Sequence, residues 1–168
     1  YRATWNATDQ VPMRAVDSGL LDRMGTIDTT DGGGSYRYSA SAEWQRTRNN
    51  ASTKVSAYGL AYDLSLYSNF TYFLNDPVNG DQFQQADHRF VSGGKVTHRR
   101  METWGGHSVQ NTFAVSVRND DIGNLGLYHT VARERLETIR EDAVMQTSAG
   151  AYVQNETEWA PWLRSLSG

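Results

Sequence analysis

The stretch KVSAYGLAYDLSLYSNFTYFL, residues 54–74, alternates between large apolar side chains and small or polar ones. In an extended chain one side of this stretch carries Tyr58, Leu60, Tyr62, Leu64 and Leu66, and the other carries Ala57, Gly59, Ala61, Asp63 and Ser65. A period of two is typical of a β-strand whose faces meet different environments. At about 20 residues the predicted strand is far longer than the ~5–6 residues usual in globular proteins.

Similar alternation on both sides of this stretch predicts an all-β protein, an antiparallel meander of about five long strands. Tyr38, Ala40, Ala42 and Trp44 form an apolar row in residues 36–47, and residues 83–104, 109–118 and 144–158 also have strand patterns. Short turns are expected near residues 48–52, 105–106 and 159–162, where Asn-Asn, Gly-Gly and Pro-Trp occur. Long loops are expected near residues 1–35, 74–87 and 119–141.

Residues 119–141 allow three interpretations: a long connection, the extended tip of a hairpin, or a short helix. The helical alternative would align five residues on one face. These are Leu125, Tyr128, Ala132, Leu136 and Ile139.

Composition excludes several classes of protein. The 168 residues include no cysteine, so a disulfide scaffold, a zinc–thiolate site and a thiol nucleophile are excluded. The 16 Lys and Arg residues are balanced by 19 Asp and Glu, which argues against nucleic-acid binding. No run approaches the ~18 apolar residues of a transmembrane helix. Because the sequence starts at Tyr1 without a signal-peptide pattern, we expect it to be an internal piece of a longer protein.

The unequal connections suggest an incomplete segment of a transmembrane β-barrel, in which short periplasmic turns alternate with long extracellular loops. Four tryptophans beside the short turns, Trp44, Trp104, Trp159 and Trp162, would form an aromatic girdle. The row that begins at Tyr58 is expected to face lipid. Asp63 is expected to face the lumen, together with further polar side chains inside or at the interface: Glu43, Gln45, Lys54, Gln110 and Arg118. The alternative is a soluble β-rich module that binds carbohydrate on exposed tryptophans.

The chain resembles the β-barrel region of TonB-dependent outer-membrane receptors. The resemblance covers residues 1–12, 24–33, 67–87 and 146–165, and the strand that runs into NDPVNGDQF is its most specific part. It implies a 22-stranded barrel in the cell outer membrane of a Gram-negative bacterium, surrounded by outer-membrane lipid. It also implies a plug domain, energy from the TonB complex and a scarce ligand such as a ferric siderophore. The plug, the TonB-contacting box and the C-terminal aromatic strand are not in this sequence, so this piece alone should not transport.

Candidate ligand-binding residues lie in two of the predicted loops. Arg2, Trp5 and Arg14 combine cationic and aromatic side chains suited to an anionic, ring-bearing ligand, although stacking within the loop is an equally good explanation. Tyr72, Asp76 and Asp81 complete the set. Acidic loops can bind calcium through carboxylates and carbonyls. The aspartates of these loops, including Asp28, Asp31 and Asp87, are more simply explained as turn formers that accept hydrogen bonds from their own backbone.

No enzyme, cofactor or metal site is predicted. The pair Asp87 and His88 could touch a metal ion, but a solvated loop pair is the better explanation. A hydrolase would need two carboxylates, such as Asp63 and Glu43, to meet across adjacent strands, and no other feature supports this.

Overall fold

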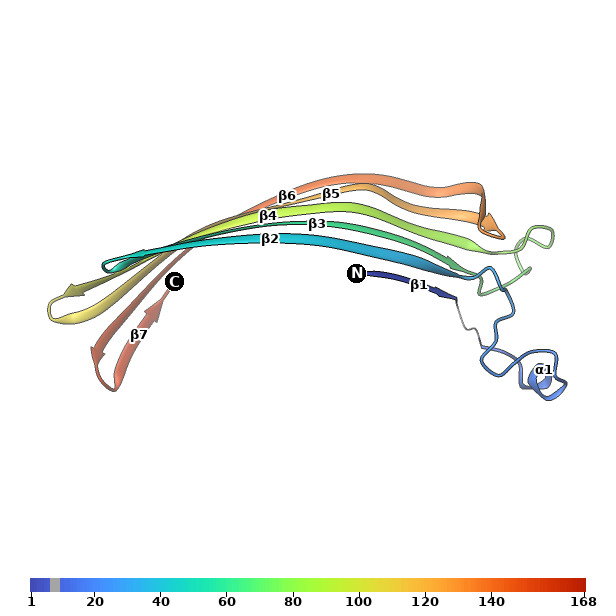
Figure 1. The fold of residues 1–168 in the computed structure, drawn as a ribbon, viewed down its shortest axis with the longest axis horizontal. Helices are drawn as coiled ribbons and strands as arrows, with labels where there is room; N and C mark the ends of the chain where they lie inside the picture. The colour runs from blue at the N-terminus through green and yellow to red at the C-terminus, as the bar shows by residue number, and fades with distance from the viewer. Residues whose placement is uncertain (7–9) are drawn as a thin grey trace. The chain divides into compact units, whose positions relative to one another are not determined.

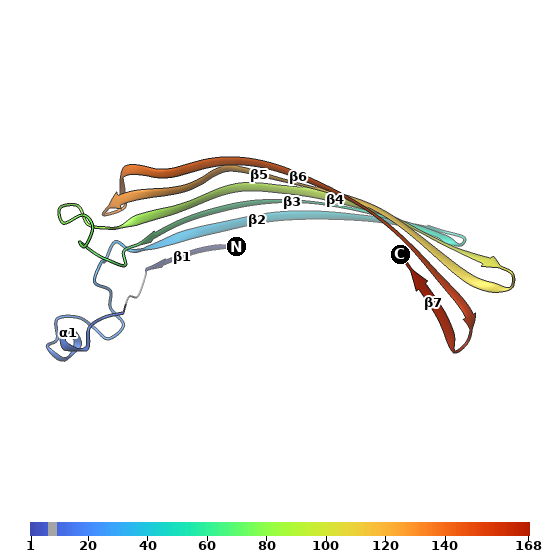
Figure 2. The same ribbon diagram turned by 180° about the vertical axis from the view of Figure 1, so that it is seen from behind.

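The computed structural model describes residues 1–6 and 10–168 and is all-β. Seven strands follow one another in chain order in a single open antiparallel sheet (Figure 1), seen from behind in Figure 2. Five of them are long, and the predicted antiparallel meander is confirmed. The elements are β1 (Arg2–Asn6), α1 (Met13–Asp17), β2 (Gly32–Arg48), β3 (Ala51–Ser68), β4 (Phe83–Trp104), β5 (His107–Val131), β6 (Glu134–Ala160) and β7 (Leu163–Ser167).

The chain divides into two compact units. Unit 1 comprises Tyr1–Tyr38, Ala61–Phe90 and Asp121–Val144. Unit 2 comprises Ser39–Leu60, Val91–Asp120 and Met145–Gly168. Unit 1 therefore holds the long connections and the β5–β6 turn, and unit 2 holds the turns at residues 49–50, 105–106 and 161–162.

Three short turns are where the sequence predicts them. Asn49, with φ 51°, and Asn50 join β2 to β3, while Gly105 and Gly106, with φ 57° and 85°, join β4 to β5. Positive φ in these turns explains why Asn and Gly occur there. Pro161 and Trp162 separate β6 from β7.

The connection over residues 119–141 is an extended hairpin tip, so the long-loop and helical interpretations are wrong. Strand β5 continues to Val131 and β6 starts at Glu134, which leaves Ala132 and Arg133 as a two-residue turn. Both have positive φ, 50° and 71°. The predicted strand of residues 54–74 is also too long, because β3 ends at Ser68. The region predicted as loop 1–35 contains β1 and α1, while the loop predicted over 74–87 runs from residue 69 to residue 82.

One face of unit 2 is polar. Glu43 on β2 forms a salt bridge with Lys54 on β3, with Oε2 and Nζ 2.8 Å apart, so these two side chains share a face. Tyr58, four residues after Lys54, lies against Gly93 of β4, where a Cβ atom would be 2.6 Å from the Tyr58 hydroxyl. A Cβ atom on Gly150 of β6 would lie 3.4 Å from the Ser116 hydroxyl of β5, so Ser116 also projects from this face. This polar face includes Ser41, Glu43, Lys54, Ser56, Tyr58, Gly93, Lys95, Ser116, Arg118 and Gly150.

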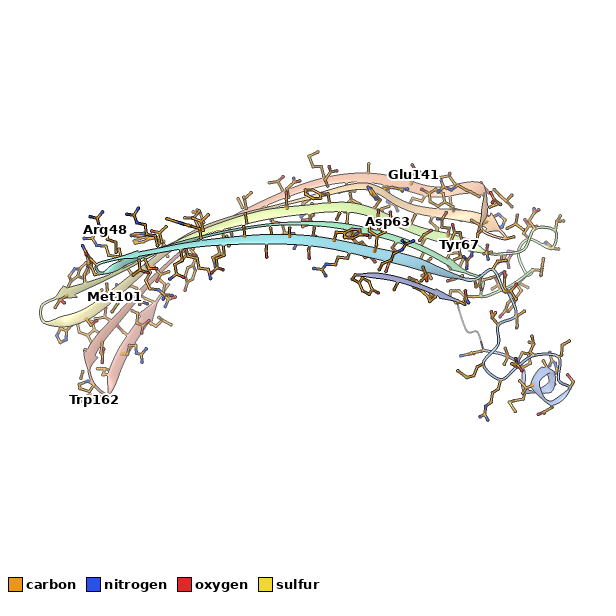
Figure 3. All side chains as sticks on the ribbon, in the orientation of Figure 1. Arg48, Asp63, Tyr67, Met101, Glu141 and Trp162 are labelled. Atoms are coloured by element: carbon orange, nitrogen blue, oxygen red, sulfur yellow. The ribbon has the colours of Figure 1, made fainter. Side chains whose placement is uncertain are left out.

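The opposite face of unit 2 is apolar and exposed. Thr53 and His98 meet on it, with Oγ1 and Nδ1 2.9 Å apart, and strand alternation places the neighbouring apolar residues there. Val115 and Val117 are 57% and 51% exposed, and Trp104 is 59% exposed. Figure 3 shows side chains on both sides of the sheet, with Arg48, Met101 and Trp162 labelled in unit 2. This apolar face comprises Ala40, Ala42, Trp44, Val55, Ala57, Val96, Trp104, Phe113, Val115, Val117, Val153 and Trp159.

The pairing of β2 with β3 corrects one prediction. The row that begins at Tyr58 was expected on the face opposite the polar side chains, but Tyr58 shares the face of Glu43 and Lys54. The small residues of β3, including Ala57, lie on the apolar face instead. Asp63, an odd number of residues from Lys54 in the same strand, projects from the other side of β3 and contacts His88. The side chain of Asp63 therefore belongs to the small-residue row of β3, as predicted, and not to the row of Lys54, with which it was expected to share the lumen.

Candidate ligand-binding site

A buried glutamine joins three segments of unit 1 that are distant in sequence. The Gln82 side chain, 2% exposed, donates from Nε2 to Thr30 Oγ1 at 2.7 Å and to Asp31 Oδ1 at 3.0 Å. Its Oε1 accepts from Thr130 Oγ1 at 3.0 Å and from the Arg133 backbone N–H at 2.9 Å. We call these residues, together with Asp28, the Gln82 cluster.

Arg133 completes the cluster with its guanidinium group. It donates to the backbone carbonyls of Thr30 and Asp31 and lies 5.3 Å from the Tyr67 ring centroid. The left-handed backbone of the hairpin tip is thus held in place by contacts with the segment that precedes β2. The cluster fixes the tip of the β5–β6 hairpin against residues 30–31 and 82.

Asp28 extends the cluster to the loop that follows β3. Its Oδ2 accepts from Asn69 Nδ2 at 3.1 Å, and Asn69 Oδ1 accepts the Tyr72 backbone N–H at 2.9 Å. Burial raises the pKa of Asp28, but hydrogen bonds from Thr30 and Asn69 and the positive charge of Arg133 outweigh burial and hold this pKa below its ordinary value. Asp28 is therefore a charged member of the site at neutral pH.

Two carboxylates organise the loop of residues 69–82. Asp81 accepts the backbone N–H groups of Asn75 and Asp76, the latter at 2.7 Å. Asp76 accepts those of Val78 and Asn79, both at 2.9 Å. A hydrogen bond from the Thr71 side chain and the loop amides lower the pKa of Asp81 to about 2. The Asn79 amides lower the pKa of Asp76 in the same way.

An open pocket of ≈ 580 Å³ lies beside this loop, and we call it the loop pocket. The volume is in the range of small-molecule sites. The Phe70 and Phe83 rings lie in its wall with their centroids 5.7 Å apart. The other lining residues are Thr71, Asn75, Asp76, Asp81, Gln85, Leu127, His129, Glu137 and Ile139.

The structure brings together only part of the predicted ligand-binding set. Asp76 and Asp81 line the loop pocket, and Tyr72 lies in the same loop with a φ of 59°. Arg2 and Trp5 are in β1, where Arg2 pairs with Tyr36 and Trp5 with Gly33. Because Trp5 follows Arg2 by three positions, an odd number, in one strand, their side chains project from opposite faces.

Arg14 lies on the short helix α1 and is exposed. Trp5 packs on Gly33 of β2, where a Cβ atom would be 3.1 Å from the indole ring. Arg2, Trp5 and Arg14 therefore do not form a shared anion site in the described part of the chain.

Sequence reasoning missed Gln82, His129, Arg133 and Glu137. Gln82 stands in the quoted NDPVNGDQF stretch, but an uncharged side chain there carries no signal of its central position. His129 Nε2 lies 2.6 Å from the Gly80 carbonyl oxygen, and because a carbonyl only accepts, this nitrogen carries the proton. Both His129 and Glu137 belong to residues 119–141, for which the sequence left a long connection, an extended hairpin tip and a short helix open.

The carboxylates considered for hydrolysis are each paired with a basic side chain. Glu43 pairs with Lys54 in unit 2, and Asp63 Oδ2 lies 3.1 Å from His88 Nδ1 in unit 1. Asp87 pairs with Arg89. Among residues 1–6 and 10–168, no group of three or more His, Asp or Glu side chains is placed to hold a metal ion.

Comparison with known proteins adds no relative. No family model, curated protein or solved structure matches the chain. No helix in the described ranges is long and apolar enough to cross a membrane.

Proposed function

We propose that the chain forms part of the wall of a TonB-dependent receptor in the outer membrane of a Gram-negative bacterium. Such a wall does no covalent chemistry. It would contact outer-membrane lipid on one face and the receptor's own plug domain on the other, and the TonB complex would act through that plug. The whole receptor would import a scarce ligand, such as a ferric siderophore.

The apolar face of unit 2 is the observation that carries this proposal. Valines, alanines and Phe113 cover its middle, and they are exposed because no second layer packs on them in the described part of the chain. A continuous apolar surface of this kind in water is unfavourable and indicates a partner surface. Lipid is such a partner, and the polar face with Glu43 and Lys54 suits an aqueous lumen.

The tryptophans support the same partner. Trp44, Trp104 and Trp159 lie on the apolar face near the short turns, and each is at least half exposed. Tryptophan is enriched where membrane-spanning segments meet the lipid headgroups. On β5, the apolar residues farther from the short turn lie in the interior of the proposed membrane band. These are Phe113, Val115 and Val117.

Accessibility of single cysteines tests this proposal directly. The chain has no native cysteine, so each introduced thiol is unique. We expect a lipid-soluble maleimide to label V55C, V115C and V117C in outer-membrane vesicles that carry the protein. A water-soluble maleimide should label the matched polar-face variants S56C and S116C. Equal labelling of both sets by the water-soluble reagent would refute a lipid-facing wall.

A soluble carbohydrate-binding module is the second candidate, and one observation favours it. Trp44 and Trp104 are exposed on the same face, as a stacking platform for sugar rings requires. The cysteine experiment separates the candidates, because a platform would leave Val115 and Val117 open to water. Quenching of tryptophan fluorescence by an oligosaccharide would then support the module.

A further inference from the structure

The loop pocket has an uneven balance of charge. Three of its lining residues, Asp76, Asp81 and Glu137, carry carboxylates, and none of the residues lining it is Lys or Arg. The proton on His129 Nε2 is already donated to the Gly80 carbonyl. The pocket therefore presents negative charge to any molecule that enters it.

The aromatic wall of the pocket adds to the same preference. Phe70 is 74% exposed, and its ring is tilted by 57° against that of Phe83. The negative face of an aromatic ring attracts ammonium groups, and such rings are used to recognise quaternary ammonium ligands. Leu127 and Ile139 supply apolar surface for the rest of a ligand.

We propose that the loop pocket binds an organic cation that has an apolar or aromatic body, such as an alkylated ammonium compound. This inference rests on the proposed receptor function and names the chemical class of ligand at its loop end. The three carboxylates that attract a cation repel an anion, so a negatively charged ferric siderophore is not expected in this pocket.

The carboxylates have different roles in this proposal. Asp76 and Asp81 already accept loop amides, so they contribute charge and hold the shape of the wall. Glu137 on β6 is exposed and has no hydrogen-bond or ion-pair partner among the described residues. Its carboxylate is therefore free to meet the ammonium group directly.

Binding of benzyltrimethylammonium to the full chain in detergent micelles, measured by titration calorimetry, tests the proposal. Benzenesulfonate, an anion of similar size, is the matched probe. We expect the cation to bind and the anion not to bind, and we expect cation affinity to fall as salt is raised. Binding of benzenesulfonate with equal or higher affinity would overturn the proposal, as would absence of cation binding to a folded chain.

Two substitutions assign the binding to this pocket. Glu137→Gln should weaken cation affinity by about two- to fivefold, the range for exposed ion pairs. Phe70→Leu should weaken it by about two- to fivefold through loss of the cation–π contact. Glu134→Gln, which removes a charge from the same strand outside the pocket, is the control. Equal effects of Glu134→Gln and Glu137→Gln would show that the cation responds only to overall charge, and would overturn the site.

Failure of this inference and failure of the proposed function give different results. If the maleimide pattern on unit 2 supports a lipid-facing wall while the cation does not bind, the wall stands and the ligand class is wrong. If the cation binds in the pocket while V115C and V117C react only with the water-soluble reagent, the pocket stands and the receptor is wrong.

Discussion

Replacing Gln82 by leucine should open the loop end of unit 1 and leave the long strands intact. The change keeps the side-chain size but removes all five hydrogen bonds that its amide makes to Asp28, Thr30, Asp31, Thr130 and Arg133. Asp31 and Thr130, 1% and 0% exposed, stay buried and lose this partner.

The magnitude follows from the number of buried groups affected. A buried polar group that loses its partner costs about 1–3 kcal/mol. Two such groups, partly relaxed by movement of the loop, give about 3 kcal/mol in the free energy of local opening. Because about 1.4 kcal/mol corresponds to a factor of ten, amide exchange in residues 28–31, 69–82 and 130–133 should be roughly a hundredfold faster.

Hydrogen exchange measured by mass spectrometry on the full chain in micelles is the assay. Gln84→Leu is the matched control, because Gln84 is only part-buried and its shortest bond is the 2.7 Å contact from Nε2 to Ser65 Oγ. Exchange in the turns of unit 2 should be unchanged by either substitution. If Gln82→Leu exchanges no faster than Gln84→Leu, the cluster does not hold the loops and our reasoning is refuted.

Three further predictions concern the faces of unit 2 and the loop. Val115→Arg, which puts a charge on the apolar face, should destabilise the vesicle-inserted protein by about 2–4 kcal/mol, measured by denaturant titration, and Ser116→Arg by much less. Gly93→Ala, whose Cβ would lie 2.6 Å from the Tyr58 hydroxyl, should cost about 1–3 kcal/mol in the same titration and much less in a chain that also carries Tyr58→Ala. Because the folded pKa of Asp81 is lowered from 3.8 to about 2, its stabilisation of the loop is complete above pH 3.8 and is lost as pH falls towards 2. Amide NMR signals of the loop should titrate with that low midpoint, and a midpoint near 3.8 would contradict the assignment.

Sequence patterns predicted the long strands and three of the hairpins because the relevant signals are local. Alternation is read within one strand, and Asn49 and Gly105 are residue types that tolerate the positive φ of their turns. An extended hairpin tip was one interpretation of residues 119–141, but its turn at Ala132 and Arg133 was not located, because neither residue favours positive φ and contacts from Gln82 and Thr30 hold it. That support comes from residues distant in the chain.

The assignment of faces failed for a related reason. Alternation shows that β3 has two rows, but only its register with β2 shows which row joins Glu43. Large apolar residues such as Tyr58 were taken for the lipid side, whereas the structure packs Tyr58 over Gly93 on the polar face. The loop pocket could not be predicted either, since its wall combines Phe70, Phe83 and His129 from segments that are far apart in the sequence.

The long sequence separations within the Gln82 cluster have a consequence for the order of folding. The hairpin at Asn49 and Asn50 closes between neighbouring residues, whereas the Arg133 side chain reaches the Thr30 carbonyl across 103 positions. Local contacts form at small entropic expense, and distant ones become favourable only after the intervening chain is ordered. We therefore expect the cluster to form after the hairpins, with its interactions absent from the rate-limiting transition state. Substitutions in it should accelerate unfolding while the rate of folding stays nearly constant.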